Sequence, residues 1–365
     1  MVHPENDAKY KGLTVNSGVD NLPSVNPYAT FRRKKRTLTP EEYFAGIRAG
    51  DITILSQAVT LVESNLLSDQ TIAQKVIEMC LPYAGHSIRL GITGVPGAGK
   101  STFIEALGVE LCNRGKKIAV LAIDPSSERS KGSILGDKTR MNDLSTKSNA
   151  FIRPSPSAGS LGGVARKTRE TIVLCEAAGY DTIVVETVGV GQSETAVHSM
   201  VDFFLLIQLA GTGDELQGIK RGIMEMADGI VINKADGNNI EKAKLAAAHF
   251  RNALHLFPPT PSKWVPEVHC YSGYYELGID ELWGMIDRYF EYVQKTGYFE
   301  HKRNEQAKYW MIETIDEQLR SNFYHTPEVA ALLEQKEIRV LNNEQSSFTA
   351  AKDILDFYFS RLKQQ

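Results

Sequence analysis

A phosphate-binding loop is the strongest chemical signal in the sequence and lies at residues 94–101. These residues read GVPGAGKS, which matches GxxxxGK[ST], and they stand between an apolar run and a helical pattern over residues 102–111. Glycines in such a loop let backbone N–H groups surround phosphate oxygens, and the helix N-terminus adds positive potential. We expect Lys100 to contact the β- and γ-phosphates and the Ser101 hydroxyl to bind Mg²⁺. The predicted phosphate-binding residues are Gly94, Val95, Pro96, Gly97, Ala98, Gly99, Lys100, Ser101 and Thr102, together with Gly189.

A second motif, Asn233-Lys234-Ala235-Asp236, follows an apolar run that ends at Ile232. The Asp236 carboxylate can accept hydrogen bonds from guanine N1–H and from the exocyclic amine, whereas adenine offers no matching pair of donors. A site built on such hydrogen bonds can reject the wrong base by about 10⁴-fold. The Lys234 stem can lie over the base, and Asn233 can hold the loop and the base edge. The sequence therefore predicts GTP rather than ATP as the bound nucleotide.

Carboxylates are expected around a metal ion beside the phosphates. Glu186 ends an apolar run and is followed three residues later by Gly189, a spacing typical of the γ-phosphate sensor of P-loop GTPases. An ionised Glu186 emerging from such a run would be costly without a nearby cation. Asp124 ends another apolar run, and Asp137 lies in segment 126–140, which we predict to be a mobile switch loop. The predicted Mg²⁺ ligands are Ser101, Asp124, Asp137 and Glu186.

Hydrolysis needs a positioned water and positive charge on the γ-phosphoryl group. Gln192 is the candidate for orienting the water. The polar, glycine-rich loop 211–221 follows another apolar run and is predicted to be a switch that senses the nucleotide or a partner. Lys220 and Arg221 in that loop are the candidates for supplying charge. The predicted catalytic residues are Lys100, Gln192 and Lys220, and we expect slow intrinsic turnover.

Five apolar runs of strand length position these motifs, at residues 88–92, 118–123, 182–185, 203–209 and 230–232. Loops and helical patterns follow them, and this alternation predicts a parallel sheet with helices on both faces. Ligands bind such sheets beyond the carboxyl ends of the strands, where the motifs lie. The predicted fold class is α/β, a P-loop NTPase with a mostly parallel sheet flanked by helices and with helical extensions at both ends.

Helical patterns flank the α/β section. Thr39 and Glu42 form a capping box with Pro40 at the first helical position, and the helical pattern continues to about residue 81 with a break near residues 50–51. After Gly278 an apolar stripe precedes polar helices near residues 304–319 and 350–362; the stripe is Leu282, Trp283, Ile286, Tyr289, Phe290 and Val293. We predict an N-terminal arm (1–37), a helical subdomain (38–85), a GTPase domain (86–280) and a C-terminal helical region (281–365).

The composition is that of an ordinary globular protein, with 365 residues, 23% of them charged, and a net charge of −3. Such a balance does not favour nucleic acid as a partner. Cys80, Cys112, Cys175 and Cys270 form no CxxC pair, which argues against a disulfide framework or a Cys-built zinc site and is typical of the reducing cytosol.

The N-terminal segment 1–30 lacks an apolar h-region and carries acids, so it predicts neither a secretory signal nor a mitochondrial presequence. The apolar runs are too short to span a bilayer, and we expect a cytoplasmic protein without a membrane partner. The basic run 32–36 is predicted to be a solvated linker, with a contact to an acidic partner or a phosphate as the alternative.

Longer stretches resemble the MeaB/ArgK family of P-loop GTPases, which includes the human methylmalonic aciduria type A protein. The resemblance spans roughly residues 39–308. It rests on GITGVPGAGKST (91–102), AIDPSSERSKGSILGDKTRM (122–141), RPSPSAGSLGGVARKTRE (153–170), ETVGVGQSE (186–194), GDELQGIKRGIMEMAD (213–228) and NKAD (233–236).

The resemblance implies a G domain of the SIMIBI class and a homodimer built through the C-terminal helices. It also implies a chaperone of adenosylcobalamin-dependent methylmalonyl-CoA mutase, in which GTP hydrolysis gates cofactor loading and protects or reactivates the mutase. Lys220 matches a lysine of a partner-responsive third switch loop. The late guanine-loop motif of the family, usually Ser-Ala, reads Ser272-Gly273 here, and both residues are expected at the base.

Several alternatives stay open at this point. A metal-delivery GTPase of the hydrogenase or urease type would share the core, but it would need Cys and His clusters that the sequence does not display. An ATP-using kinase or transport ATPase is disfavoured by Asp236. A scaffold that binds GTP without hydrolysing it is a third alternative. The client could also be a related acyl-CoA mutase, acting on isobutyryl-CoA or ethylmalonyl-CoA.

Overall fold

The computed structural model describes residues 38–123, 141–154, 161–187, 193–210, 221–275 and 277–363. From Pro40 onward the chain forms one compact unit, Pro40–Gln365, so the divisions predicted near residues 85 and 280 stay predictions. Within the described ranges, none of the helices combines the length and the apolar character that crossing a bilayer requires.

A seven-stranded sheet with the order β3-β2-β4-β1-β5-β6-β7 forms the centre, and every neighbouring pair is parallel. The predicted α/β class is therefore confirmed. All five predicted strands are present, three of them slightly longer than expected, whereas β3 and β7 at the two edges were missed. The strands are β1 (Ile88–Gly94), β2 (Ile118–Ile123), β3 (Ala150–Pro154), β4 (Thr182–Thr187), β5 (Phe203–Leu209), β6 (Gly229–Asn233) and β7 (Glu267–Cys270).

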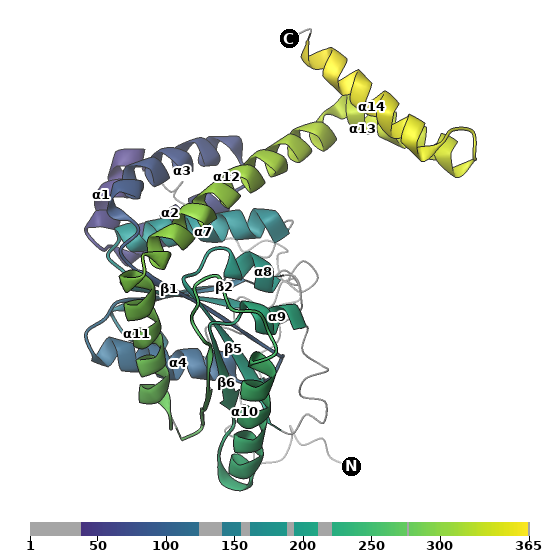
Figure 1. Ribbon diagram of the computed structural model, residues 1–365. Helices are drawn as coiled ribbons and strands as arrows, with labels where there is room; N and C mark the ends of the chain where they lie inside the picture. The colour runs from purple at the N-terminus through teal and green to yellow at the C-terminus, as the bar shows by residue number, and fades with distance from the viewer. Residues whose placement is uncertain are drawn as a thin grey trace, which may run out of the picture. The chain divides into compact units, whose positions relative to one another are not determined.

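Helices cover both faces of the sheet (Figure 1). One face carries α4 (Lys100–Asn113) and α11 (Ile279–Lys295), with the short α6 (Asn142–Ser145) beside α4. Apolar residues of α4 and α11 share one core with β1 and β5, in which Phe103 and Tyr289 are almost fully buried. The other face carries α7 (Leu161–Ala177), α8 (Ser193–His198), α9 (Arg221–Met226) and α10 (Ile240–Leu254).

Three N-terminal helices pack on α7: α1 (Pro40–Arg48), α2 (Ile52–Glu63) and α3 (Leu67–Cys80), with a 3-10 turn at Leu81–Tyr83. The predicted break at residues 50–51 is present, because Asp51 caps α2 by accepting hydrogen bonds from the Thr53 and Ile54 amides. Arg48 donates to the Ala177 carbonyl at 2.7 Å and thus ties α1 to the end of α7. These helices form an outer layer over one face of the sheet.

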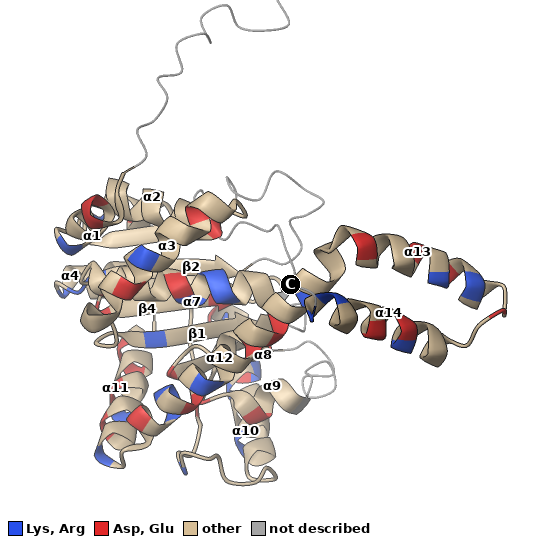
Figure 2. Cartoon of the chain, turned by 90° about the horizontal axis from the view of Figure 1, so that it is seen from above, with Lys and Arg blue, Asp and Glu red and all other residues tan. Residues whose placement is uncertain are grey.

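The C-terminal part consists of α12 (Tyr298–His325), α13 (Pro327–Leu341) and α14 (Ser347–Leu362). The predicted helix at 304–319 is thus a segment of a longer one, and α13 was not predicted as a separate helix. The apolar stripe lies on α11 as expected, except that Trp283 is only partly buried and Met285 takes a core position. Helices α13 and α14 pack against each other and carry side chains of both charge signs (Figure 2).

Candidate functional site

The phosphate-binding motif forms the turn between β1 and α4. Gly94, Gly97 and Gly99 have φ angles of 153°, 79° and 88°, a region in which side chains other than hydrogen cause strain. A Cβ on Gly94 would lie 2.1 Å from the Ile207 carbonyl oxygen of β5. The glycine spacing is therefore required by this backbone path, which brings the loop tightly against the neighbouring strand.

Lys100, the first residue of α4, turns its side chain back into this loop. Its Nζ donates to the carbonyl oxygens of Gly94 at 2.9 Å and Val95 at 3.3 Å. The side chain is largely buried, and burial lowers its pKa while the charges of Glu186 and Glu194 raise it. The ammonium thus sits within the curve of the loop, where the motif predicts phosphate oxygens.

The predicted metal ligands Ser101 and Glu186 meet beside the loop. The Ser101 hydroxyl donates to Glu186 Oε1 at 3.1 Å, although the two residues come from α4 and β4. A hydroxyl and a carboxylate are the oxygen donors that Mg²⁺ prefers, so this pair fits the ion. The other two predicted ligands, Asp124 and Asp137, lie outside the described residues. In the described ranges, His, Cys, Asp and Glu form no group of three that could hold a metal by itself.

Asn233 joins the guanine motif to the phosphate loop. It ends β6, is 2% exposed, and its Nδ2 donates to the Ala98 carbonyl at 2.7 Å. Its Oδ1 accepts from the Lys234 amide at 2.7 Å and from the Gly273 amide at 3.2 Å. One side-chain amide therefore holds three segments together: the phosphate loop, the NKAD loop and the loop after β7. The sequence motif predicted Asn233 as a base-side residue but gave no sign of its bond to Ala98.

Asp236 lies beside the loop after β7. The Ser272 hydroxyl donates to Asp236 Oδ2 at 2.6 Å and accepts from the Tyr275 amide at 3.3 Å. The neighbouring Lys234 adopts a φ of 58°, uncommon for a residue with a side chain. The predicted guanine-binding residues thus gather at one corner, at the carboxyl ends of β6 and β7.

Gly273 has no structural need to be glycine. A Cβ built on it would meet its nearest neighbour, Thr102 Cγ2, at 3.4 Å, which is ordinary van der Waals contact. The departure from the usual Ser-Ala pair leaves the position of the loop intact, because the Gly273 amide still bonds to Asn233.

The remaining predicted site residues lie outside the described residues: Asp124, Asp137, Gly189, Gln192 and Lys220. A residue that sequence reasoning missed is Glu194 in the first turn of α8, which is 2% exposed and whose charge acts on Lys100. It belongs to the stretch ETVGVGQSE, so the motif contained it without indicating a role. A buried hydrogen bond of 2.8 Å from Thr187 to Thr93 further links the ends of β4 and β1.

Comparison with known proteins agrees with this geometry. The sequence model of a family described as methylmalonyl-CoA mutase-associated GTPase MeaB matches residues 55–328. A putative GTPase of Caulobacter vibrioides is 50% identical over 84% of this chain and 94% of its own length. The mitochondrial methylmalonic aciduria type A homolog of Mus musculus is 43% identical over 88% of this chain and 80% of its own length.

A solved structure described as a LAO/AO transport system kinase has a TM-score of 0.70 and 38% identity, covering 87% of this chain and 97% of that chain. The resemblance seen in the motifs is thereby confirmed over most of the sequence. With a glycine-rich phosphate loop and an NKAD loop at the same edge of a parallel sheet, this chain belongs to the MeaB family of P-loop GTPases and is a GTP-hydrolysing enzyme.

Proposed function

We propose that this GTPase is a chaperone of adenosylcobalamin-dependent methylmalonyl-CoA mutase. In this role GTP hydrolysis gates loading of the cofactor and protects or reactivates the mutase. The observation that carries the proposal is the match of residues 55–328 to a family described as mutase-associated. The mouse relative, described by the related term methylmalonic aciduria type A, supports the same client.

The geometry supports separate roles for the residues of the site in binding the base, the phosphates and the metal ion. Asp236, held by Ser272, would accept the two guanine donors, while Asn233 fixes the spacing between base and phosphates. Lys100 would exchange its bonds to loop carbonyls for bonds to phosphate oxygens. Ser101 and Glu186 would hold Mg²⁺, which supplies positive charge to the phosphates when bound.

The hydrolytic step is assigned to residues outside the described part of the chain. Gly189 would contact the γ-phosphate, Gln192 would orient the water, and Lys220 would add positive charge when the partner docks. Asp124 and Asp137 would complete the metal shell. Each of these roles is a proposal from the family motifs.

Nucleotide choice is tested by Asp236→Ala. Wild-type protein should bind GTP far more tightly than ATP, and the variant should lose most of this preference because the paired acceptor is gone. Affinities for GTP and ATP are measured by competition with a fluorescent GDP analogue. A variant that still prefers GTP as strongly would overturn the assignment of Asp236, and would reopen the kinase or ATPase alternative.

The client is tested by adding purified mutases to the GTPase. Methylmalonyl-CoA mutase should raise the rate of GTP turnover, whereas isobutyryl-CoA and ethylmalonyl-CoA mutases should raise it less. Pull-down from the native host should recover the same mutase. If a related mutase stimulates more strongly, it is the client instead. If no cobalamin mutase is recovered or stimulates turnover, the chaperone proposal fails and metal delivery becomes the alternative to test.

We further propose a cytoplasmic homodimer built through the C-terminal helices. Large apolar side chains are exposed there, including Met311, Leu319, Leu341 and Phe348 at 61%, 60%, 74% and 88%. Burying such a surface against a second copy would remove its contact with water. Light scattering of the purified chain tests the dimer, and a monomer at micromolar concentration would contradict it.

A further inference from the structure

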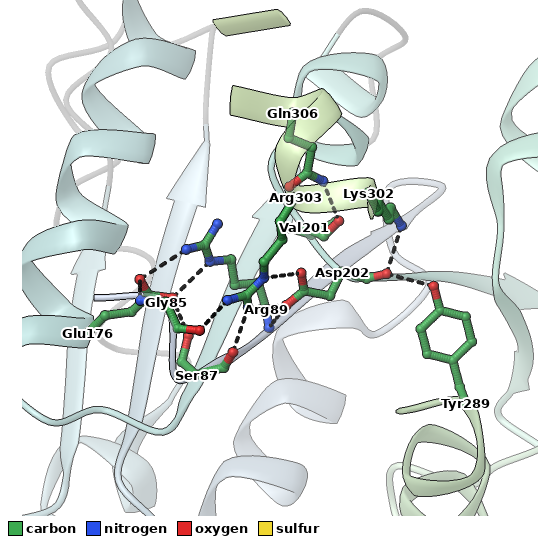
Figure 3. Close-up of polar contacts among 10 residues, drawn as sticks. All are labelled: Gly85, Ser87, Arg89, Glu176, Val201, Asp202, Tyr289, Lys302, Arg303 and Gln306. Carbon is green, nitrogen blue, oxygen red and sulfur yellow. Dashed lines mark hydrogen bonds and ion pairs between the residues drawn. The ribbon is translucent and has the colours of Figure 1, made fainter. Parts of the chain in front are cut away.

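Helix α12 is hydrogen-bonded to residues 199–202, the short segment that joins α8 to β5. Three α12 side chains spaced four residues apart lie on one face of the helix and donate to consecutive parts of this segment. Lys302 Nζ donates to the Asp202 carbonyl at 2.7 Å, Gln306 Nε2 to the Val201 carbonyl at 2.8 Å, and Trp310 Nε1 to the Ser199 carbonyl at 3.0 Å. Figure 3 shows the first two of these contacts.

The first turns of α12 are fixed to the amino ends of the strands. Arg303 donates to both carboxylate oxygens of Asp202, at 2.9 and 2.7 Å, and to the Ser87 carbonyl at 2.6 Å (Figure 3). Asp202 is 1% exposed and also accepts from the Arg89 amide at 2.9 Å. A buried ion pair with these additional hydrogen bonds is costly to disrupt, so this part of α12 moves with the sheet.

Trp310 lies further along α12, and its side chain contacts the end of α8 rather than a strand. The indole is 7% exposed, and the Arg169 guanidinium of α7 lies 5.7 Å from its ring centroid. Arg169 also donates to the Gln306 carbonyl at 3.0 Å. The indole is therefore packed between α7 and the Ser199 carbonyl, and its position depends on where α8 ends.

The other end of α8 lies next to the nucleotide site. Ser193 and Glu194 begin this six-residue helix, are 0% and 2% exposed, and the Glu194 charge acts on Lys100 of the phosphate loop. In sequence, α8 follows β4 and the residues expected to sense the γ-phosphate. Because α8 is only six residues long, a displacement of its first turn would also move Ser199, the residue that follows its end.

We propose that Gln306 and Trp310 are positioning residues for GTP hydrolysis, acting by holding the end of α8. Their hydrogen bonds fix the end of α8 from the side opposite the nucleotide. Through α8 they also fix its first turn, which directly follows Gln192 in the sequence. The coupling is reciprocal: a change of nucleotide that shifts α8 changes the environment of Trp310 and hence the path of α12. This coupling between the nucleotide site and α12 does not depend on which enzyme is the client of the GTPase.

The first test follows the three tryptophans, Trp264, Trp283 and Trp310, by fluorine NMR of the full chain labelled with 5-fluorotryptophan. The Trp310 resonance should differ between the GDP form and the form bound to a non-hydrolysable GTP analogue. The Trp264 resonance should stay constant, because its indole bonds to the Asp228 carbonyl at the amino end of β6. An unchanged Trp310 resonance, or equal changes at all three, would overturn the proposal.

The second test is kinetic and compares Trp310→Phe with Trp283→Phe. Both replace an indole by a phenyl ring, but in the described part of the chain the Trp283 indole N–H makes no hydrogen bond. Trp310→Phe should lower kcat for GTP about fivefold, which corresponds to ~1 kcal/mol in the barrier, with KM changed less than about twofold. Trp283→Phe should leave both constants near the wild-type values.

Gln306→Met provides a second variant of similar size in case Trp310→Phe does not fold, as judged by circular dichroism. It removes the bond to the Val201 carbonyl and should also lower kcat with little effect on KM. Wild-type kcat in the folded variants would overturn the proposal. An equal loss in the Trp283→Phe control would do the same, because the effect would then reflect packing alone.

Discussion

Replacing Asn233 by alanine should weaken GTP and GDP binding equally. The side chain makes three hydrogen bonds, of 2.7, 2.7 and 3.2 Å, that join the phosphate loop, the NKAD loop and the loop after β7. Each such bond contributes about 1 kcal/mol net, and a buried partner left unsatisfied costs at least as much. Part of this loss also weakens the nucleotide-free fold, so we expect about 2 kcal/mol to appear in binding, or ~30-fold in Kd.

The assay is titration calorimetry with GDP and with a non-hydrolysable GTP analogue, together with thermal denaturation of the nucleotide-free protein. The matched control is Asn239→Ala, which removes an exposed hydrogen bond of 2.7 Å to the Lys234 carbonyl in the same loop. The control should change Kd less than about threefold, since an exposed bond is replaced by water. A folded Asn233→Ala protein with wild-type Kd refutes the bridging role, and a loss confined to the GTP analogue would place the effect at the γ-phosphate instead.

Three further outcomes are expected. Gly273→Ala should keep GTP affinity within about threefold, because its new methyl group meets Thr102 at an ordinary contact distance of 3.4 Å; a tenfold loss in calorimetry would contradict the available space. Burial, reinforced by the charge of nearby Lys302, lowers the pKa of His198 to about 4 from 6.5. Between pH 4 and pH 6.5 the unfolded chain therefore binds more protons than the folded protein, and the stability of the fold falls as the pH drops through this range. Urea unfolding should show His198→Phe losing less stability than wild type from pH 7 to pH 4.5, and parallel pH profiles would contradict the assignment. Arg303→Met should lower the free energy of unfolding by about 3–5 kcal/mol, because Asp202 is then left buried without its partner. Urea titration measures this cost, and a loss below about 1 kcal/mol would show that the ion pair is not needed to fix α12.

The central strands were predictable because buried strands of a parallel sheet are continuous apolar runs, as in the sequence FFLLIQL of β5. The edge strands were not. β7 reads EVHC, and β3 contains Arg153 and ends with Pro154, so neither forms an apolar run of the kind that marks a fully buried strand.

As with the strands, the parts of the site given by short local motifs were predictable, and the contacts between residues far apart in the sequence were not. The positions of Lys100, Ser101, Glu186 and Asp236 at this edge of the sheet were predictable because short motifs follow the strands there, whereas their roles toward the nucleotide stay predictions. The bond from Asn233 to Ala98 depends on how β6 and β1 lie in the sheet, with β5 between them, which no local pattern encodes. The bond from Trp310 to Ser199 likewise joins residues 111 positions apart in the chain.

The strand order also affects how the chain folds during synthesis. β1 pairs with β4 and β5, so Ile88 leaves the ribosome long before its partner Thr182, and the phosphate loop emerges long before Asn233 and Gly273. Such long-range parallel pairing is slow to form and leaves apolar strands exposed in the meantime. In the proposed site the nucleotide contacts both early and late segments, so GTP would bind only a nearly finished chain, and its binding energy would then stabilise the completed sheet against reopening.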